Sequence, residues 1–421
     1  MPFDVDALRS AFPSLSSGIA HFDGPGGTQT PLVVGEAIAR AMTSPTSIRG
    51  TGVASERNAE ATVQGFRRAY ADLLGAEPSG IVHGRSATQL TYDFARHLAK
   101  TWSAGDEIVV SRLDHDANIR PWLQAAESAG ATVQWLEFDA STGEITDESV
   151  ARAITGRTRL VAVTAASNLI GTEPDVRALA DRAHEVGALV WIDGVHFTAH
   201  ESVDVAALGA DFFVCSPYKF FGPHCGVLAA DPALLESIHP DKLLPSTDVV
   251  PERFEFGTLP YEQLAGATAA VDFIAGIVGG DSAGAGHAEA GSAPSRREAI
   301  LASMAATHAH ESGLRARLEE ALLAIPGLTL HSRAARRTPT LYVTIEGRRM
   351  RDLTVNLAEL DVLAPTGHFY ALEAFQSMGL DADTTGLRIG LAAYTSGDDV
   401  ERLLAGMRSF VEDGAVAAVS A

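Results

Sequence analysis

The fold is indicated first by the stretch Asp211-Phe212-Phe213-Val214-Cys215-Ser216-Pro217-Tyr218-Lys219-Phe220-Phe221-Gly222-Pro223. Its apolar first half is typical of a buried strand, and its second half closes in a Gly-Pro turn. Lys219 lies between them, so we expect it in a partly apolar cleft. Desolvation there lowers the pKa of the amine and leaves it free to attack an aldehyde. The alternative is a solvated loop lysine, and the residues upstream decide between the two.

This stretch belongs to a longer region, between about residues 65 and 230, in which apolar β-rich runs alternate with helical patterns. This alternation predicts an α/β fold with a mainly parallel sheet covered by helices. One intervening helix is expected over 175–186, where Pro174 suits its start and Gly187 its end. The predicted strands are Glu107 to Val110, Thr132 to Leu136, Leu160 to Thr164, Leu189 to Ile192 and Phe212 to Cys215.

The rest of the chain predicts a second, smaller α+β domain. Residues 276–295 are rich in Gly, Ala and Ser and are expected to form a flexible connector. A long helical pattern starts at Arg296, and a strand (340–346) and a helix (398–407) follow. We therefore expect a large domain at 21–275 and a small domain at 296–421, with residues 1–20 packing against the small domain.

Composition excludes several classes of protein. Hydrophobic residues make up 46% of the 421 residues, enough for a sizeable core, and the formal net charge is −21. That negative charge repels a phosphate backbone and argues against nucleic acid or an anionic membrane surface as a partner. No apolar run reaches membrane-spanning length. A small anionic ligand stays possible, because a few local donors can bind it.

The two cysteines, Cys215 and Cys225, are too few for a disulfide framework or a structural zinc site. No metal site is expected. The first residues are acidic and show no signal peptide. The sequence therefore favours a cytoplasmic protein.

Polar residues follow several predicted strands, at the edge of the sheet where α/β proteins bind ligands. Asp193, after the strand at 189–192, can pair with the pyridine nitrogen of pyridoxal phosphate, which Lys219 can carry as a Schiff base. His196 and Asn168 can reach the phenolic oxygen of the same ring. The alternatives are a helix-capping aspartate and polar side chains that satisfy backbone groups.

Three further features suit the same ligand. His115, after the strand at 107–110, can lie on an aromatic ring and shuttle protons, or can be a surface histidine. Residues 84–89 precede a helical pattern beginning near Leu90, and such a turn can bind a phosphate, with help from Ser216 and Tyr218. Arg388, in the apolar run 387–391, can bind a substrate carboxylate through two hydrogen bonds, or can be a snorkelling or salt-bridged arginine.

In order and spacing, these segments resemble the class V aminotransferase family of fold-type I pyridoxal-phosphate enzymes, and most of all its cysteine desulfurase-like branch. The resemblance covers nearly the whole chain. It is carried by Phe22 to Pro31, His115 to Trp122, Ser167 to Thr172, Asp193-Gly194-Val195-His196, Ser216-Pro217-Tyr218-Lys219, Glu255-Phe256-Gly257-Thr258 and Arg388.

The resemblance implies a pyridoxal 5'-phosphate enzyme with two active sites at a homodimer interface. Lys219 would hold the cofactor and then act as the base on the substrate. His115 would lie on the ring, and Arg388 would bind the carboxylate of a small amino acid. Gly257 and Thr258 would reach the phosphate of the other subunit. The phosphate is assigned to Ala87, Thr88, Ser216 and Tyr218, the ring nitrogen to Asp193, the phenolic side to Asn168 and His196, and side-chain selectivity to Gly26, His368 and Tyr370.

Two residues depart from the desulfurase pattern. His196 replaces the usual glutamine, a change found in other class V enzymes. Tyr370, in the segment 366–371, stands where desulfurases of this type carry a mobile sulfur-accepting cysteine. Neither Cys215 nor Cys225 is an evident substitute. The sequence therefore favours desulfurase-like or C–S/β-lyase chemistry without a protein persulfide, with an aminotransferase or amino-acid epimerase as the alternative.

Overall fold

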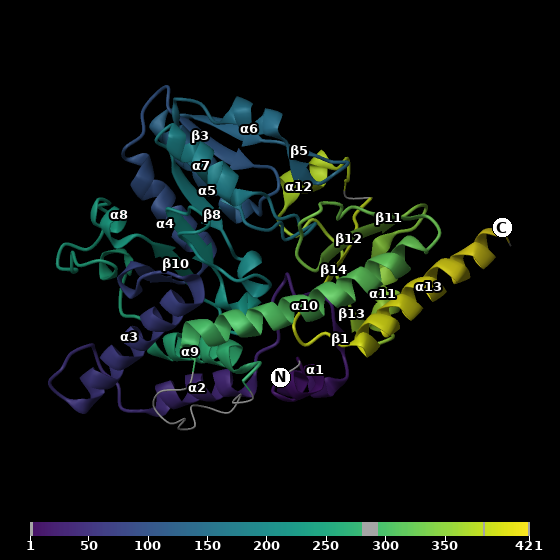
Figure 1. The fold of residues 1–421 in the computed structure, drawn as a ribbon, viewed down its shortest axis with the longest axis horizontal. Helices are drawn as coiled ribbons and strands as arrows, with labels where there is room; N and C mark the ends of the chain where they lie inside the picture. The colour runs from purple at the N-terminus through teal and green to yellow at the C-terminus, as the bar shows by residue number, and fades with distance from the viewer. Residues whose placement is uncertain (1–2, 280–293, 382–383, 420–421) are drawn as a thin grey trace.

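A computed structural model of the chain describes residues 3–279, 294–381 and 384–419 (Figure 1). Most of the connector expected at 276–295 lies outside these residues. The helix before it, α9 (Tyr261–Gly276), and the one after it, α10 (Arg296–Leu323), end and begin where the sequence pattern changes.

Among the described residues, the main sheet has seven strands in the order β2-β10-β9-β8-β7-β3-β4. Neighbouring strands from β9 to β4 are parallel, whereas β10 is antiparallel to both of its neighbours. The mainly parallel sheet predicted from the sequence is thus confirmed. The strands are β2 (Ile81–Gly84), β3 (Glu107–Ser111), β4 (Thr132–Leu136), β7 (Thr158–Thr164), β8 (Leu189–Asp193), β9 (Phe212–Cys215) and β10 (Gly226–Ala230).

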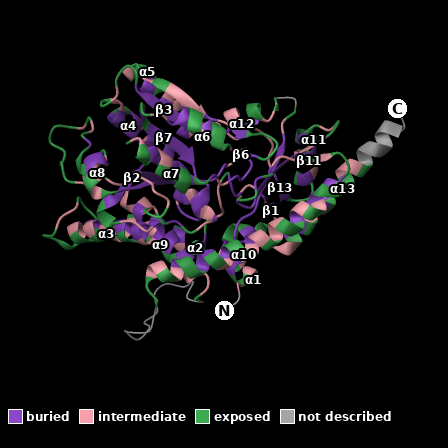
Figure 2. Ribbon diagram, turned by 45° about the horizontal axis from the view of Figure 1, so that its top comes forward, coloured by how far each residue is buried: buried purple, intermediate pink, exposed green. Residues whose placement is uncertain are grey.

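Both faces of this sheet are buried, and alternate residues of each strand enter different apolar clusters. In β8, Val190 and Ile192 belong to one cluster and Trp191 to the other. The first face is covered by α3 (Ala54–Leu74), α7 (Val176–Glu185), α9 and part of α10. The second is covered by α4 (Ala87–Ala99), α5 (Arg120–Ala129) and α8 (Pro232–Glu236). Figure 2 shows the buried strands between partly exposed helices. This layering explains the near-continuous apolar runs in the sequence.

A smaller sheet lies near the C-terminal end of the chain. β11 (Leu328–Leu330), β12 (Thr340–Ile345) and β14 (Leu387–Gly390) pair antiparallel, and β1 (Ala20–His21) pairs with β13 (Val362–Leu363). These elements share an apolar cluster with α11 (Met350–Ala358) and α13 (Gly397–Val419). The smaller α+β unit agrees with the predicted fold class.

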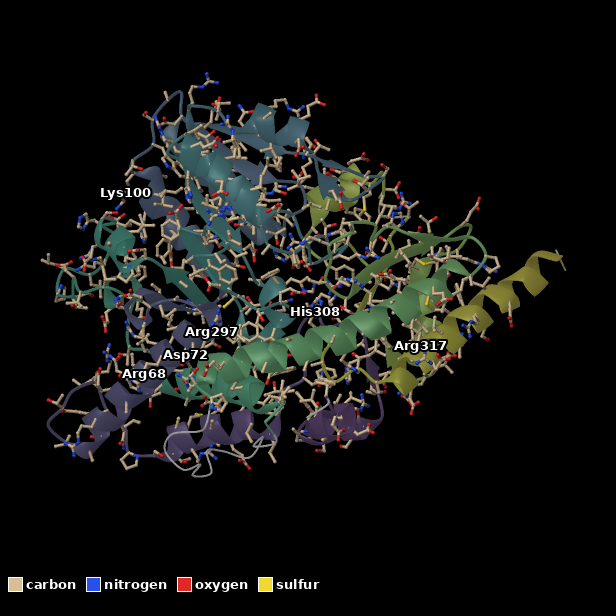
Figure 3. The ribbon with its side chains drawn as sticks, viewed as in Figure 1. Arg68, Asp72, Lys100, Arg297, His308 and Arg317 are labelled. Atoms are coloured by element: carbon tan, nitrogen blue, oxygen red, sulfur yellow. The ribbon has the colours of Figure 1, made fainter. Side chains whose placement is uncertain are left out.

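Helix α10 connects the two regions (Figures 1 and 3). Near its start, Arg297 donates to the backbone carbonyl of Asp72 at the end of α3. In its middle, His308 lies 2.6 Å from a carboxylate oxygen of Glu201, and farther along Arg317 pairs with Glu401 of α13 at 2.5 Å. One helix therefore contacts the large sheet region and the C-terminal region.

The N-terminal segment also touches both regions. Leu8 of α1 (Val5–Ser10) and Phe12 belong to the apolar cluster of the large sheet, whereas Arg9 binds the carbonyl of Tyr394 and the carboxylate of Asp399. The domain boundaries expected from the sequence stay a prediction.

The other described elements are short or peripheral. No helix in the described part of the chain has the length and apolar content needed to cross a bilayer. The short or peripheral elements are α2 (Leu32–Thr43), α6 (Asp147–Ala153), α12 (Leu372–Ser377), β5 (Phe138–Asp139), β6 (Glu144–Ile145) and 3-10 turns at 13–17, 78–80, 116–118, 197–199, 217–219 and 252–254.

Candidate active site

The strands bring the predicted site residues to one edge of the sheet. β3, β7, β8 and β9 are parallel, so their carboxyl ends meet there, and the two antiparallel pairings of β10 return β2 to the same direction. A cavity opens at this edge. Its lining consists of Ser86, Ala87, Thr88, Thr91, His115, Ala117, Thr164, Ala166, Asn168, Asp193, Val195, His196, Ser216, Tyr218 and Lys219.

Lys219 ends the 3-10 turn that follows β9, and 8% of the residue is exposed. Its Nζ donates to the backbone carbonyl of Pro25 and lies 5.0 Å from the centre of the Tyr218 ring. Burial, reinforced by the charge of Arg388, lowers the pKa of the amine to about 7. A large fraction of the amine is therefore neutral near pH 7 and able to act as a nucleophile or base.

Asp193 is the last residue of β8 and is buried. Its Oδ1 accepts a hydrogen bond from the Val195 backbone N–H at 2.8 Å. Burial raises the pKa of this carboxyl to about 6, although the Val195 N–H and the charge of Lys219 favour ionisation. A cationic partner inside the cavity would stabilise the carboxylate and lower that pKa.

Asn168 and His196 each present an unsatisfied polar atom at the cavity. His196 Nε2 lies 3.0 Å from Thr338 Oγ1 and 2.8 Å from Thr340 Oγ1, and Asn168 Nδ2 donates to the carbonyl of Phe369 at 2.9 Å. His196 Nδ1 and Asn168 Oδ1 are buried without a hydrogen-bond partner among the described residues. Buried polar atoms seldom stay unpaired in a complete site.

His115 lines the same cavity. Its Nδ1 accepts from the Ala117 backbone N–H at 3.0 Å, which fixes the ring. The Tyr370 ring lies 5.4 Å from the His115 ring, centre to centre, at an interplanar angle of 33°. Burial, then the charges of Lys219 and Arg388, lowers the pKa of His115 to about 4, and burial places that of His196 well below its usual value. Both rings are neutral at pH 7.

The amino end of α4 forms one wall of the cavity. The helix begins at Ala87, three residues before the start expected near Leu90, because Ser86 caps it by accepting from the Gln89 N–H at 3.0 Å. Thr88 lies in the first turn and is exposed. The free N–H groups of this turn and the helix dipole favour an anion.

Arg388 lies in β14, and 2% of the residue is exposed. Its guanidinium forms an ion pair with Asp23 at 2.5 Å, donates to the carbonyl of Asn168 at 3.1 Å, and stacks on the Phe369 ring at 3.7 Å. The salt-bridged arginine that the sequence allowed is thus present. Binding of a substrate carboxylate stays a prediction.

The structure does not bring every predicted residue into this cavity. Gly26 lines a neighbouring cavity, on which Tyr218 also borders, and His368 and Tyr370 are exposed. Gly257 and Thr258 are exposed as well, and Thr258 lines a third cavity beside Arg85. Their predicted role toward the other subunit stays a prediction.

Several residues at the site carried no local sequence signal. Thr338 and Thr340 contact His196 from a segment more than 140 positions later, and Phe369 stacks on Arg388. Asp23 lies within the longer motif Phe22 to Pro31. An acidic residue in an otherwise Gly-Pro turn was the available signal.

Both sulfur atoms are buried away from the cavity lining. Cys215 lies in β9 and Cys225 lies just before β10, and each is at most 1% exposed. Burial raises the pKa of Cys215 well above its usual value and that of Cys225 to about 12. Both thiols are therefore protonated and inaccessible at neutral pH.

Metal ligands do not cluster in the described ranges, where no group of three or more His, Cys, Asp or Glu side chains could hold a metal ion. The candidate site rests on amine, carboxylate, imidazole and backbone groups.

Comparison with known proteins identifies the class of enzyme. The family model for aminotransferase class-V matches residues 20–289 and 299–403. A probable cysteine desulfurase of Vibrio cholerae is 30% identical over 98% of this chain and 100% of its own length. An uncharacterized protein of Mycobacterium tuberculosis is 30% identical over 97% of this chain and 100% of its own length.

A solved structure gives the same result. The Escherichia coli cysteine desulfurase CsdA, in its S-sulfonic acid form, has a TM-score of 0.83 at 25% identity, over 98% of this chain and 99% of that one. The fold is therefore that of the fold-type I pyridoxal-phosphate enzymes. The chain belongs to the class V aminotransferase family, in its cysteine desulfurase-like branch.

The residues present fit the cofactor of that family. Asn168 and His196 line the cavity, and Asn168 Oδ1 and His196 Nδ1 are buried without a hydrogen-bond partner among the described residues, so each could bond a polar group of a ligand. Gly226 leaves room for the first turn of α4, because a Cβ there would lie 2.4 Å from the Ser86 carbonyl carbon. A buried carboxylate and a lysine of lowered pKa complete a donor set suited to a pyridine ring bearing an aldehyde and a phosphate.

Proposed function

We propose that this chain is a pyridoxal 5'-phosphate enzyme that cleaves at the β-carbon of a small L-amino acid, in desulfurase-like or C–S/β-lyase chemistry without a protein persulfide. The observation that carries the proposal is the site of Lys219, a buried amine of lowered pKa in one cavity with Asp193. The bound cofactor would supply an electron sink for the carbanion that forms at the substrate α-carbon.

The residues of the chain have separate roles in this proposal. Lys219 Nζ attaches the cofactor and later removes the α-proton, for which its lowered pKa suits it. Asp193 carries the negative charge that keeps the pyridine nitrogen protonated. His115, neutral at pH 7, covers the ring face and excludes water. Asn168 and His196 orient the phenolic oxygen. Ala87, Thr88, Ser216 and Tyr218 hold the phosphate.

The absence of a protein persulfide is supported by two features. Tyr370 occupies the segment in which related desulfurases carry their cysteine, and its ring packs near His115. The two cysteines of the sequence are buried and protonated. Sulfur would then leave as sulfide, with water consumed and pyruvate and ammonia as the other products, or would pass to a small external thiol as its persulfide while alanine is released.

A homodimer is part of the proposal. Gly257 and Thr258 are exposed and outside the cavity of their own chain. The loop is nevertheless fixed, because the Glu255 carboxylate pairs with Arg67 at 2.9 Å and accepts from the His83 N–H at 3.0 Å. Such a loop suits contact with a second subunit. Light scattering of the purified chain at several concentrations tests this directly.

The decisive test has two stages. First, the protein is loaded with pyridoxal phosphate, reduced with borohydride and mapped by mass spectrometry. The cofactor should be found on Lys219, and Lys219→Ala should remain colourless. Second, the loaded enzyme is incubated with cysteine, cysteine sulfinate and cysteine S-conjugates. Release of alanine, sulfide or pyruvate supports the proposal, and no turnover across this panel contradicts it.

The same assays separate the alternative activities. Conversion of the cofactor to its amine form on adding an amino donor would indicate an aminotransferase. Appearance of the D-amino acid with the β-carbon intact would indicate an epimerase. Either result without β-cleavage would contradict the proposed reaction and support the corresponding alternative activity.

A further inference from the structure

The guanidinium of Arg388 is already engaged by other groups of the chain. Its Nη2 is paired with Asp23 Oδ1 at 2.5 Å, and its Nη1 donates to the Asn168 carbonyl at 3.1 Å. One face of the group is covered by Phe369 at 3.7 Å. A carboxylate that binds through two hydrogen bonds needs two adjacent N–H groups. With Asp23 in place, one N–H group of the Arg388 guanidinium is already paired with a carboxylate of the chain itself.

Asp23 is held in position by its turn. Its backbone carbonyl accepts from the N–H groups of Gly26 and Gly27 at 2.8 and 3.1 Å, and its backbone pairs with that of Gly390 beside Arg388. Its side chain is 32% exposed and lines the cavity that Gly26 and Tyr218 share. Asp23 therefore has a fixed backbone and a partly exposed carboxylate that lines the cavity next to the one holding Lys219.

Gly26 is what allows the carboxylate to lie there. A Cβ at position 26 would be 2.3 Å from Asp23 Oδ2, 2.6 Å from its Cγ and 2.7 Å from its Oδ1. All three are atoms of the same side chain. The absence of a side chain at Gly26 therefore leaves the space that the Asp23 carboxylate occupies.

We propose that Asp23 is a specificity-determining residue that competes with the substrate carboxylate for Arg388. The inference rests on the proposed function, because it takes Arg388 as the group that receives that carboxylate. Two carboxylates at one buried guanidinium repel each other, so Asp23 must turn away or share the group when the substrate binds. Asp23 therefore weakens the binding of simple carboxylates and selects for ligands whose other contacts offset this cost.

The experiment uses the cofactor-loaded full chain and a probe that cannot react. Propionate carries a carboxylate without an amino group, and propionamide is its uncharged analogue. Their dissociation constants are measured by NMR titration of the probe methyl signal, which reads binding and not turnover. In Asp23→Asn we expect propionate to bind roughly tenfold more tightly or better, whereas propionamide changes little. Unchanged or weaker propionate binding overturns the proposal and makes Asp23 an orienting residue.

Glu262→Gln is the matched control. Glu262 lines the same neighbouring cavity as Asp23, and no ion pair joins it to Arg388 in the described structure. The variant removes one negative charge near the site while leaving the guanidinium as it is. Propionate affinity should stay close to that of the parent. An equal gain in propionate affinity in Asp23→Asn and Glu262→Gln would indicate a general electrostatic effect and contradict a specific role of Asp23.

Gly26→Ala is an independent way to free Arg388 from Asp23. Its Cβ displaces the Asp23 carboxylate without removing the charge. We expect Gly26→Ala to tighten propionate binding in the parent but to add nothing in the Asp23→Asn background. An equal effect in both backgrounds contradicts the proposal. Retention of the cofactor colour in every variant distinguishes failure of this inference from failure of the proposed function, which would appear as an absence of that colour in the parent.

Discussion

Gly226, the first residue of β10, lies directly against the backbone that joins Ser86 to Ala87. A Cβ at position 226 would be 2.4 Å from the Ser86 carbonyl carbon and 2.6 Å from the Ala87 nitrogen. These are backbone atoms, so they cannot rotate away as a side chain could. The close approach places the first turn of α4 at the cavity, where its free N–H groups favour binding of an anion.

Gly226→Ala should therefore move the amino end of α4 and weaken binding of pyridoxal phosphate by roughly tenfold or more. The dissociation constant is measured by titrating the apoprotein with the cofactor and following its absorbance. Gly65→Ala in α3 is the control, because a Cβ there meets no atom of the described structure within 4 Å. Equal cofactor affinity in the parent and Gly226→Ala would rule out this role of the close approach.

The sequence predicted the parallel strands from β9 to β4 but missed the two strands on the β2 side of the sheet. β7, β8 and β9 are apolar runs of Val, Ile, Leu and Phe buried on both faces, and a local pattern identifies such strands. β2 and β10 are wrongly absent from the predicted strands. β10 reads Gly226 to Ala230, which has few β-branched residues, and it forms because it pairs antiparallel with β2 and β9.

In the site, too, local sequence patterns predict some residues, whereas contacts between distant segments position the others. Asp193 and Lys219 could be predicted because each follows a recognisable strand, and the carboxyl ends of parallel strands meet at one edge. The contacts of His196 with Thr338 and Thr340, and of Arg388 with Asp23, join segments more than 140 positions apart. No periodicity encodes such pairs. They depend on how the C-terminal sheet is set against the large one.

The lowered pKa of Lys219 has a measurable effect on the stability of the apoprotein. The amine has a pKa of about 7 in the folded chain and an ordinary value of 10.5. Between these pH values the unfolded state binds a proton that the folded state does not, so this group makes stability rise with pH from about 7 to 10.5. Below pH 7 both states are protonated and the contribution of this group is constant.

Urea unfolding of the apoprotein at pH 7 and pH 9 tests this effect. Lys219→Met keeps the apolar stem and removes the titrating group, so it should be more stable than the parent at pH 7. Its advantage should shrink at pH 9, because the parent no longer carries the cost of burying a charge. An advantage that does not change with pH would show that the Lys219 pKa is ordinary in the folded protein.

Glu311 of α10 and His200 form a buried side-chain contact next to His196. His200 Nδ1 lies 2.9 Å from Glu311 Oε2, both side chains are at most 3% exposed, and the His200 ring packs 4.9 Å from that of His196. Removing one partner leaves a buried polar group uncompensated. Glu311→Ala should lower the free energy of unfolding by about 1–3 kcal/mol, because His200 Nδ1 loses its buried hydrogen-bond partner.

Denaturant titration of this variant is compared with Glu320→Ala, an exposed position on the same helix. The control should change stability by about 0.5 kcal/mol or less. A double-mutant cycle with His200→Ala then isolates the pair, and a coupling energy near zero would show that Glu311 acts through other neighbours.

The cysteines provide the sharpest test of chemistry without a protein persulfide. Cys215 and Cys225 are buried with raised pKa values, so neither sulfur can reach a substrate in the described cavity. The double variant Cys215→Ala, Cys225→Ala should lose about 1 kcal/mol of stability per site through the small voids created. Its turnover on the sulfur-containing substrate should match the parent, measured as sulfide, pyruvate or alanine released per cofactor. A large loss of turnover with the cofactor absorbance intact would mean that one of these thiols becomes accessible and carries sulfur, because the variant changes nothing else at the site.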